Sequence, residues 1–176
     1  YVDGKIVMLD MCAAPGGKST KLATKLNHTG LLISNDISSS RCLGLLKNIE
    51  LFGCDNAWVA SEDLTNMEQH YPETFDKILV DAPWSGEGMF RKEPDVIKSW
   101  IEKDDTVYPP IQKNILNAAI SMLKPGGSIV YSTCTFSIHE NEEVIQDVLD
   151  KHPDLHLAPI NKINGMMPGV NMEECV

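Results

Sequence analysis

Little in this sequence marks a secreted, metal-bound or membrane-spanning protein. Its five cysteines are odd in number and include no CxxC pair, which argues against a disulfide framework and against a zinc site. No apolar run approaches the roughly 20 residues that a membrane-spanning helix requires. No basic segment leads into an apolar stretch near the N-terminus, as it would in a signal peptide. We therefore expect a cytoplasmic protein that has reduced thiols, binds no metal and does not contact membranes.

Positive charge is also scarce. The chain has 15 Lys and Arg residues against 25 Asp and Glu residues, which gives a net charge of −10. Phosphate binding rests mainly on Lys and Arg. Either the substrate is therefore not a nucleic acid, or the basic surface lies in a local loop or a flanking domain. The 176 residues, 43% of them apolar, suffice for one soluble domain with a full core, and we expect a monomer.

Short β-rich runs alternate with helical patterns along the chain, which is typical of an α/β fold with a mainly parallel sheet. The predicted strands are Lys5–Asp10, Leu31–Asn35, Ala57–Ala60, Lys77–Asp81, Ser128–Ser132 and Leu155–Ile160. The predicted helices are Lys18–Leu26, Ser39–Leu51, Val96–Glu102, Ile111–Leu123 and Glu140–Lys151. Residues 1–160 are interpreted as one domain. Residues 161–176 show no periodicity and are interpreted as an incomplete C-terminal tail.

Small residues crowd the turn after the first predicted strand, Asp10–Lys18. Ligands of an open parallel sheet bind beyond the carboxyl ends of its strands, where small residues allow close approach and a helix offers free N–H groups. The turn matches neither a Walker A loop nor GxGxxG, so Gly16 and Gly17 alone also fit a plain strand-to-helix turn. Asp36 follows the second strand, where a carboxylate suits ribose hydroxyls. A solvated helix cap is the commoner use of such an acid.

Asp81 and Cys134 follow two further predicted strands. An acid at the end of a buried strand is costly without partners, so we favour a functional role for Asp81. A lone Cys is usually a small buried hydrophobe. Cys134, however, follows a strand end, among hydroxyl residues and at the same sheet edge as Lys18. This placement points to a nucleophile.

Five segments form a combined signature: DMCAAPGGK (Asp10–Lys18), NDIS (Asn35–Ser38), DAPWSGEGMFRK (Asp81–Lys92), YSTCTFS (Tyr131–Ser137) and ENEEV (Glu140–Val144). Together they resemble the RNA 5-methylcytosine methyltransferases of the Nop/Sun type, most of all the bacterial ribosomal RNA (cytosine-C5) branch. The likeness runs from about Val2 to Ile160. It implies a Rossmann-like class I methyltransferase fold with helices on both faces of the sheet and the final strand missing. It also implies S-adenosylmethionine as cofactor and RNA, with ribosomal RNA favoured, as partner.

The resemblance also implies roles for individual residues. Asp36 would hold the ribose of the cofactor and Asp63 its adenine, although the sequence alone reads Asp63 as a solvated loop acid. Asp81 would lie between the cofactor and the target base, and Cys134 would attack carbon 6 of the cytosine. Lys18 would supply positive charge that favours the thiolate. The methionine portion of the cofactor would be held by Cys12, Ala13, Ala14, Pro15, Gly16, Gly17 and Lys18.

Trp84 departs from the family pattern, which has a Cys between the Pro and the Ser of this motif. In the RNA family that Cys is associated with release of the covalent intermediate, so Trp84 predicts slow or absent turnover and leaves Cys134 as the candidate nucleophile. The indole is alternatively a stacking partner for a base. Arg91 and Lys92, in the loop that follows, fit RNA contact or a solvated charged loop.

Other functions stay open at this point. A non-catalytic cofactor- or RNA-binding module is favoured by Trp84 and by the acidic charge. A small-molecule methyltransferase would leave the Cys134 motif without a purpose. Transfer RNA is an alternative to ribosomal RNA. The family implies N-terminal helices and a C-terminal RNA-binding domain that are absent here and would carry basic surface.

Overall fold

The computed structural model describes residues 5–92, 95–102 and 106–159. The chain forms two compact units. The first unit comprises residues 1–82 and 115–132, and the second comprises residues 83–114 and 133–176.

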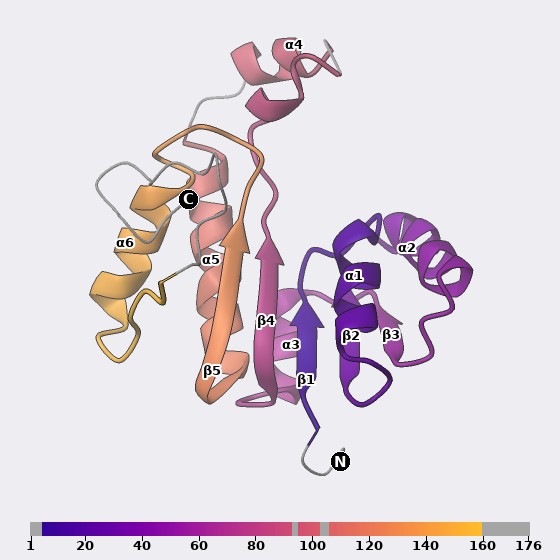
Figure 1. The fold of residues 1–176 in the computed structure, drawn as a ribbon. Coiled ribbons are helices and arrows are strands. Elements are labelled where there is room, and N and C mark those ends of the chain that lie inside the picture. Colours follow the sequence, from indigo (N-terminus) through magenta and orange to yellow (C-terminus); the bar gives the residue numbers. More distant parts are fainter. Residues whose placement is uncertain (1–4, 93–94, 103–105, 160–176) are drawn as a thin grey trace. The chain divides into compact units, whose positions relative to one another are not determined.

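The first unit is built on a five-stranded sheet in the order β3-β2-β1-β4-β5, and every neighbouring pair is parallel (Figure 1). Its strands are β1 (Val7–Asp10), β2 (Leu31–Asn35), β3 (Ala57–Ala60), β4 (Phe75–Asp81) and β5 (Leu123–Ser132). The strand order reverses between β1 and β4. In open α/β sheets this reversal opens a crevice at the carboxyl ends of the two strands, where ligands bind.

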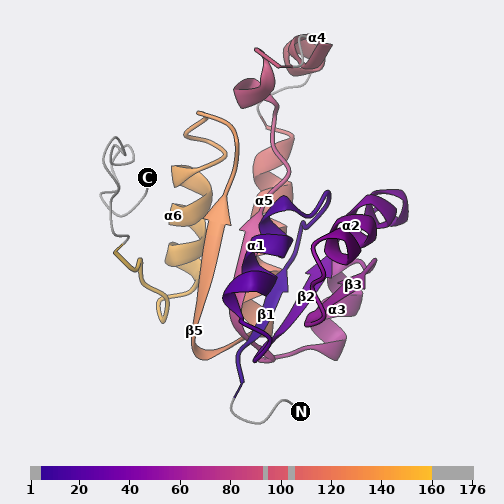
Figure 2. The same ribbon diagram turned by 45° about the vertical axis from the view of Figure 1, so that its right-hand side comes forward.

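Helices cover both faces of this sheet. Figures 1 and 2 show α1 (Gly17–Lys25) and α2 (Ser39–Leu51) on one face. On the opposite face lie α3 (Leu64–His70) and the C-terminal part of α5 (Tyr108–Met122). Because the central strands are covered on both sides, they are apolar along their length rather than alternating. Leu9, Leu32, Phe75 and Val80 are fully buried.

The second unit holds the segments that follow β4 and β5. It contains the 3-10 turn η1 (Glu87–Met89), α4 (Asp95–Glu102), the N-terminal part of α5 and α6 (Glu142–Lys151). Phe90 meets Trp100 edge to face, with ring centroids 5.5 Å apart, and so packs the loop after η1 against α4. Val144 and Val148 form the buried side of α6.

The sequence predicts most of these elements, and β2, α2 and β3 have the predicted bounds. Helix α3 was not predicted. The strand predicted at Leu155–Ile160 is wrong for residues 155–159, and Ile160 lies outside the described residues. Leu155 and Leu157 are half-buried between exposed neighbours, which is the alternation that suggested a strand, but no ladder forms there. The tail predicted at residues 161–176 also lies outside the described residues.

Two features are absent from the described part of the chain, a membrane-spanning helix and a metal-binding cluster. None of its helices combines the length and apolar character needed to cross a membrane. Within those same residues, no group of three or more His, Cys, Asp or Glu side chains is arranged to hold a metal ion.

Candidate functional site

Asp10 ends β1 with its carboxyl group almost fully enclosed, at 1% exposure. Its Oδ2 accepts a hydrogen bond of 2.7 Å from Ser19 Oγ, whereas Oδ1 has no partner in the described part of the chain. Burial raises the pKa of Asp10 from 3.8 to about 6, because the charged form loses its hydration, and the Ser19 hydrogen bond only partly offsets this. Asp10 Oδ1 is thus a buried hydrogen-bond acceptor at the start of the glycine-containing turn, and no described residue donates to it.

The turn after Asp10 requires small residues. Gly16 has φ +109, in the left-handed region, and a Cβ there would lie 2.9 Å from Leu45 Cδ1. The backbone at Ala13 and Ala14 is anchored to the next strand: Ala13 N–H donates to Asn35 O at 2.8 Å, and Ala14 N–H donates to the Asp36 carboxylate at 3.2 Å. Helix α1 then begins without a side-chain cap, so its first amides keep free hydrogen-bonding capacity.

Asp36 is buried at 2% exposure and serves this turn. Besides the Ala14 amide, its carboxylate accepts from Ser38 N–H at 3.0 Å and lies 3.2 Å from Arg41 Nη1. Arg41 also donates to Ala14 O at 2.7 Å. The alternative of a solvated helix cap does not hold, because Ser38 is the N-cap of α2. The predicted contact with ribose stays a prediction.

Asp63 is an exposed N-cap, and its side chain accepts from Asn66 N–H at 2.9 Å at the start of α3. The signal for this helix was present in the sequence, since Asp63 precedes Leu64 and Met67 at helical spacing. Both residues are at least half-buried, Met67 almost completely. Asp63 is therefore exposed, as the solvated-acid interpretation expects, but its carboxylate also caps a helix.

Asp81 ends β4 with both carboxylate oxygens occupied. Lys18 Nζ lies 2.6 Å from Oδ2, and Ser132 Oγ donates to Oδ1 at 2.7 Å. Asp81 and Ser132 are also register partners at the carboxyl ends of β4 and β5. Three chain segments that are distant in sequence therefore meet at one carboxylate. Two hydrogen bonds from different directions fix the orientation of its plane.

A cleft of about 320 Å³ lies at the reversal point of the sheet. It is lined by Asp10, Cys12, Ala13, Ala14, Pro15, Gly17, Lys18, Lys21 and Asp81. The structure thus brings together most of the residues predicted to hold the methionine portion, together with Asp81. Gly16 shapes the turn from behind, and Asp36 and Asp63 do not line the cleft. Sequence reasoning missed Lys21, which lies about one helical turn after Gly17 in α1.

Cys12 faces this cleft, but its thiol is not activated. Burial, together with the negative charges of Asp10, Asp36 and Asp81, raises its pKa from 9.0 to about 12. Because the thiolate is the nucleophilic form, we expect Cys12 to react far more slowly near neutral pH than a thiol of ordinary pKa. It is a small lining residue of the cleft.

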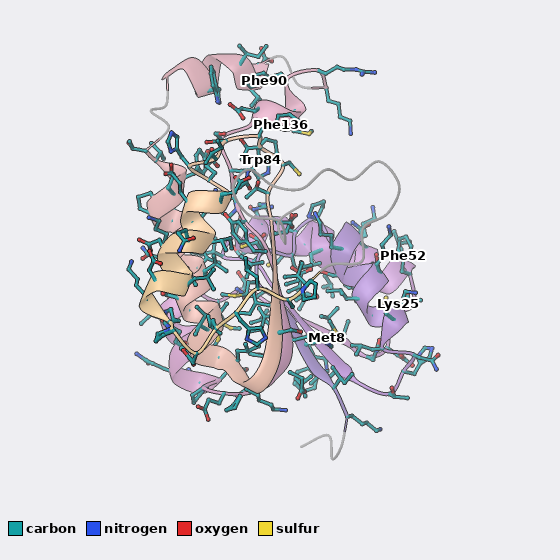
Figure 3. All side chains as sticks on the ribbon, turned by 60° about the vertical axis from the view of Figure 1, so that its left-hand side comes forward. Met8, Lys25, Phe52, Trp84, Phe90 and Phe136 are labelled. Carbon is teal, nitrogen blue, oxygen red and sulfur yellow. The ribbon has the colours of Figure 1, made fainter. Side chains whose placement is uncertain are left out.

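Cys134 lies in the second unit as a free, exposed thiol, so the alternative of a buried hydrophobe does not hold. Its carbonyl oxygen accepts from Gly88 N–H at 3.0 Å, which joins the loop containing Cys134 to the loop containing Trp84. Trp84 is half-buried, and Figure 3 marks it together with Phe136 of the Cys134 loop. Arg91 and Lys92 are exposed, as RNA contact would require. The sequence singled out the ENEEV motif but gave its Glu140 and Asn141 no role, and both bind these loops.

Comparisons with known proteins relate this chain to one protein family. Residues 2–174 match the family model described as 16S rRNA methyltransferase RsmB/F. The chain is 45% identical over 146 residues to Ribosomal RNA small subunit methyltransferase F of Aeromonas hydrophila. That match covers 82% of this chain and 30% of that protein, so the chain spans about a third of the length of this curated relative.

Solved structures give a similar result. The structure of NSun6 from Pyrococcus horikoshii with SFG matches at a TM-score of 0.82 and 33% identity, covering 96% of this chain and 42% of that chain. A SAM-dependent O-methyltransferase from Thermotoga maritima matches at a TM-score of 0.56 and 15% identity, covering 88% of this chain and 46% of that chain. At that identity the second likeness shows the fold alone.

Proposed function

Because the chain belongs to the RsmB/F family of 16S rRNA methyltransferases, we propose that it transfers a methyl group from S-adenosylmethionine to carbon 5 of a cytosine in ribosomal RNA. One observation carries this proposal. The Asp81 carboxylate is held at the mouth of the cleft by Lys18 and Ser132. Cys134 follows Ser132 by two residues, and the covalent chain limits their Cα separation to about 7 Å.

The lining of the cleft suits the methionine portion of the proposed cofactor in its chemistry. Its small lining residues admit a ligand close to the backbone, and Asp10 keeps an unpartnered buried oxygen beside it. Lys18, Lys21 and the uncapped start of α1 suit a carboxylate, while Asp10 and Asp81 suit a cation. S-adenosylmethionine, when bound, supplies a methyl group on a positively charged sulfur. Residues Cys12–Lys18 would hold its methionine portion, Asp36 its ribose and Asp63 its adenine.

Cys134 would be the nucleophile. Carbon 5 of cytosine is a poor nucleophile until a thiolate adds to carbon 6, which forms a carbon–sulfur bond and moves the ring electrons to carbon 5. Carbon 5 would then take the methyl group, and the electrons of the former methyl–sulfur bond would stay on the donor sulfur as a neutral thioether. Carbon 5 would release its proton to solvent. The carbon–sulfur bond breaks, and the ring double bond returns. The base must leave any stack to reach such a nucleophile.

Asp81 and Lys18 would act on the base and on each other. We assign Asp81 to the edge of the target cytosine, because its plane is already fixed from two sides. The short ion pair supports Lys18 as the residue that orients this carboxylate, in addition to the positive charge expected of it. Arg91 and Lys92 would contact the RNA backbone near the site.

Trp84 limits the proposed reaction. An indole cannot act as the thiol that the family carries at this position, so the Cys134 adduct would be released slowly. Adduct formation and methyl transfer do not require that second thiol. We therefore propose an enzyme that completes a first turnover and is slow in later ones.

The decisive experiment measures transfer of labelled methyl groups from S-adenosylmethionine to 16S rRNA, followed by identification of the modified nucleoside. We expect 5-methylcytidine from the wild-type chain and none from Cys134→Ser. Cys54→Ser is the matched control, because Cys54 is a half-buried thiol away from the cleft. Binding of S-adenosylmethionine with no methyl transfer, even in a Trp84→Cys variant, would instead indicate a non-catalytic module. Label in transfer RNA alone would change the substrate class.

A further inference from the structure

Asn141 begins α6 but does not cap it. Asn is among the best N-cap residues because its side-chain oxygen normally accepts an amide of the first turn. Here Asn141 stands at the N-cap position, and its side chain makes no capping hydrogen bond. The first turn of the helix instead has Glu142 and Glu143, whose negative charges suit the positive end of the helix dipole. In addition, Glu143 N–H donates to Ile138 O at 3.0 Å. The Asn141 amide is therefore used elsewhere.

Its amide group encloses the loop that contains Cys134. Asn141 Oδ1 accepts from Thr133 Oγ1 at 2.6 Å. Asn141 Nδ2 donates to Thr135 O at 3.2 Å and to Ser137 O at 2.9 Å. One side chain thus bonds the residues directly before and directly after Cys134 and a third residue further along. These three hydrogen bonds use both donor hydrogens and one acceptor position of the Asn141 amide.

Two neighbouring residues, Glu87 and Gly88, hold the same loop through three further hydrogen bonds. Glu87 Oε2 accepts from Thr135 Oγ1 at 2.7 Å and from Phe136 N–H at 3.1 Å. Gly88 N–H donates to Cys134 O at 3.0 Å, and a Cβ on Gly88 would lie 2.0 Å from that oxygen. Cys134 itself therefore contributes only its backbone to the network, which leaves its thiol exposed.

The residue before Asn141 does the same for the loop that contains Trp84. Glu140 is buried at 1% exposure, and its Oε2 accepts from Ser85 N–H at 3.1 Å and from Gln112 Nε2 at 2.9 Å. Gln112 Nε2 also donates to Pro83 O at 2.9 Å. The consecutive residues Glu140 and Asn141 thus connect both loops to the start of one helix.

We infer that Asn141 is a positioning residue for the nucleophile: its amide fixes the backbone on both sides of Cys134 and so sets the direction of the thiol. This inference rests on the proposed role of Cys134. A nucleophile gains most of its advantage from orientation, and a misplacement of about 1 Å can cost on the order of 100-fold in rate. Loss of the amide should therefore lower the rate of bond formation while substrate affinity stays unchanged.

The test uses the full chain and an RNA containing 5-fluorocytosine, in which carbon 5 cannot lose a proton, so that the adduct with carbon 6 stays covalent. We compare wild type with Asn141→Ala and Asn141→Asp. The Asp variant keeps the shape and the acceptor for Thr133 but replaces both donors to the carbonyl groups. At saturating RNA and S-adenosylmethionine we expect both variants to form adduct about 10- to 100-fold more slowly. The half-saturating RNA concentration should change less than about twofold.

Three controls make the result specific. Thr133→Ser keeps the hydroxyl that bonds Asn141 and should retain the wild-type rate. Thr133→Val removes that bond together with the longer contact of 3.4 Å from Thr135 N–H to Thr133 Oγ1. It should slow adduct formation without unfolding the chain, even if both Asn141 variants unfold. Gln146→Ala removes an exposed amide of the same helix, whose partner is Asp150, and should leave the rate unchanged.

The outcomes separate the two proposals. Wild-type adduct rates in Asn141→Ala, Asn141→Asp and Thr133→Val, with no adduct in Cys134→Ser, would overturn the positioning role and leave the proposed function intact. A rise in the half-saturating RNA concentration at an unchanged maximal rate would also overturn it. Absence of adduct in the wild-type chain would overturn both proposals.

Discussion

Lys18 Nζ and Asp81 Oδ2 lie 2.6 Å apart, although 63 residues separate them in the chain. Lys18 stands in the first turn of α1, and Asp81 is the last residue of β4, so their ion pair joins the two sides of the sheet reversal. Both side chains are partly exposed, at 50% and 30%, and such pairs contribute little to stability. The value of the pair lies in orientation, because it leaves the Asp81 carboxylate with one fixed plane at the mouth of the cleft.

Asp81→Asn is expected to reduce methyl transfer about 100- to 1,000-fold, in the range seen when one preorganised electrostatic contact is removed from an active site. The amide keeps the size of the side chain but loses the charge that holds Lys18. Initial rates at saturating RNA would show the effect in the maximal rate. Asp55→Asn, which changes an exposed carboxylate paired with His28, is the control and should keep full activity. Equal rates in both variants would exclude a catalytic role for Asp81.

Asp10 should make the protein less stable as pH rises from about 4 to about 6. Its folded-state pKa of about 6 lies above the ordinary 3.8, so the folded chain binds more protons than the unfolded chain across this window. The resulting penalty approaches about 3 kcal/mol above pH 6, at about 1.4 kcal/mol per pKa unit. Urea unfolding of wild type and Asp10→Asn between pH 4 and pH 7 measures it, and the advantage of the variant should grow with pH.

The comparison with Asp10→Asn also cancels the contribution of Asp76 to the pH dependence of stability, which has the opposite sign. Despite the unfavourable effect of burial, the Val7 amide and Lys124 hold the pKa of Asp76 below its ordinary value. Asp76 therefore contributes stability that is lost as pH falls. That contribution is present in both proteins and cancels in the difference. A difference that is constant with pH would show that Asp10 is already ionised in the folded state.

The cysteines should differ sharply in reactivity toward iodoacetamide at pH 7.5. Cys134 is exposed, whereas Cys42 is buried and Cys12 has a pKa raised from 9.0 to about 12. A shift of that size lowers the thiolate fraction of Cys12 about 1,000-fold, and the thiolate is the reacting form. Among the cysteines that the structure describes, mass-spectrometric peptide mapping over time should show Cys134 modified first and Cys12 far behind it. Rapid labelling of Cys12 would contradict the enclosed, negatively charged surroundings found for it.

The sequence was sufficient to predict the family and the fold. The Nop/Sun likeness is confirmed by the family match, and the Rossmann-like parallel sheet is confirmed by its strand order and its structural neighbours. Both rest on local patterns: apolar runs indicate the buried strands, and five short motifs together indicate the family. Such patterns are written in consecutive residues, so a single sequence carries them.

What the sequence could not supply is the bonding that joins distant segments. The Asp81 carboxylate has partners from α1 and β5, and the Asn141 amide binds three residues of the preceding loop. The strand predicted at Leu155–Ile160 failed over residues 155–159 for the same reason, because a strand needs a neighbouring strand that an apolar alternation cannot reveal. The roles predicted for Asp36 and Asp63 stay predictions, since their carboxylates bond within the chain.

Gly16→Ala is expected to destabilise the chain by about 1–3 kcal/mol, because an L side chain is strained at φ +109 and its Cβ would press on Leu45. The shifted turn should also weaken binding of S-adenosylmethionine, measured by calorimetry. Gly44→Ala is the matched control. A Cβ at Gly44 meets nothing within 4 Å in α2, and the change should stabilise the helix by up to about 1 kcal/mol. Equal stability of the two variants would show that the turn adapts to a side chain.

Trp84→Cys should convert a single-turnover protein into one that turns over repeatedly. The family carries a thiol at this position, and that thiol is associated with releasing the covalent intermediate, whereas the half-buried indole offers no thiol. With RNA in large excess, wild type should release at most about one methylated RNA per chain and retain RNA in a complex stable to denaturant. The variant should accumulate product linearly and retain little RNA.

Trp84→Ser separates the effect of space from the effect of the thiol, because it removes the indole without adding a thiol. Linear product in Trp84→Ser would show that the indole acts by obstruction. If Trp84→Cys still released at most about one methylated RNA per chain, a group other than the Trp84 side chain would limit product release.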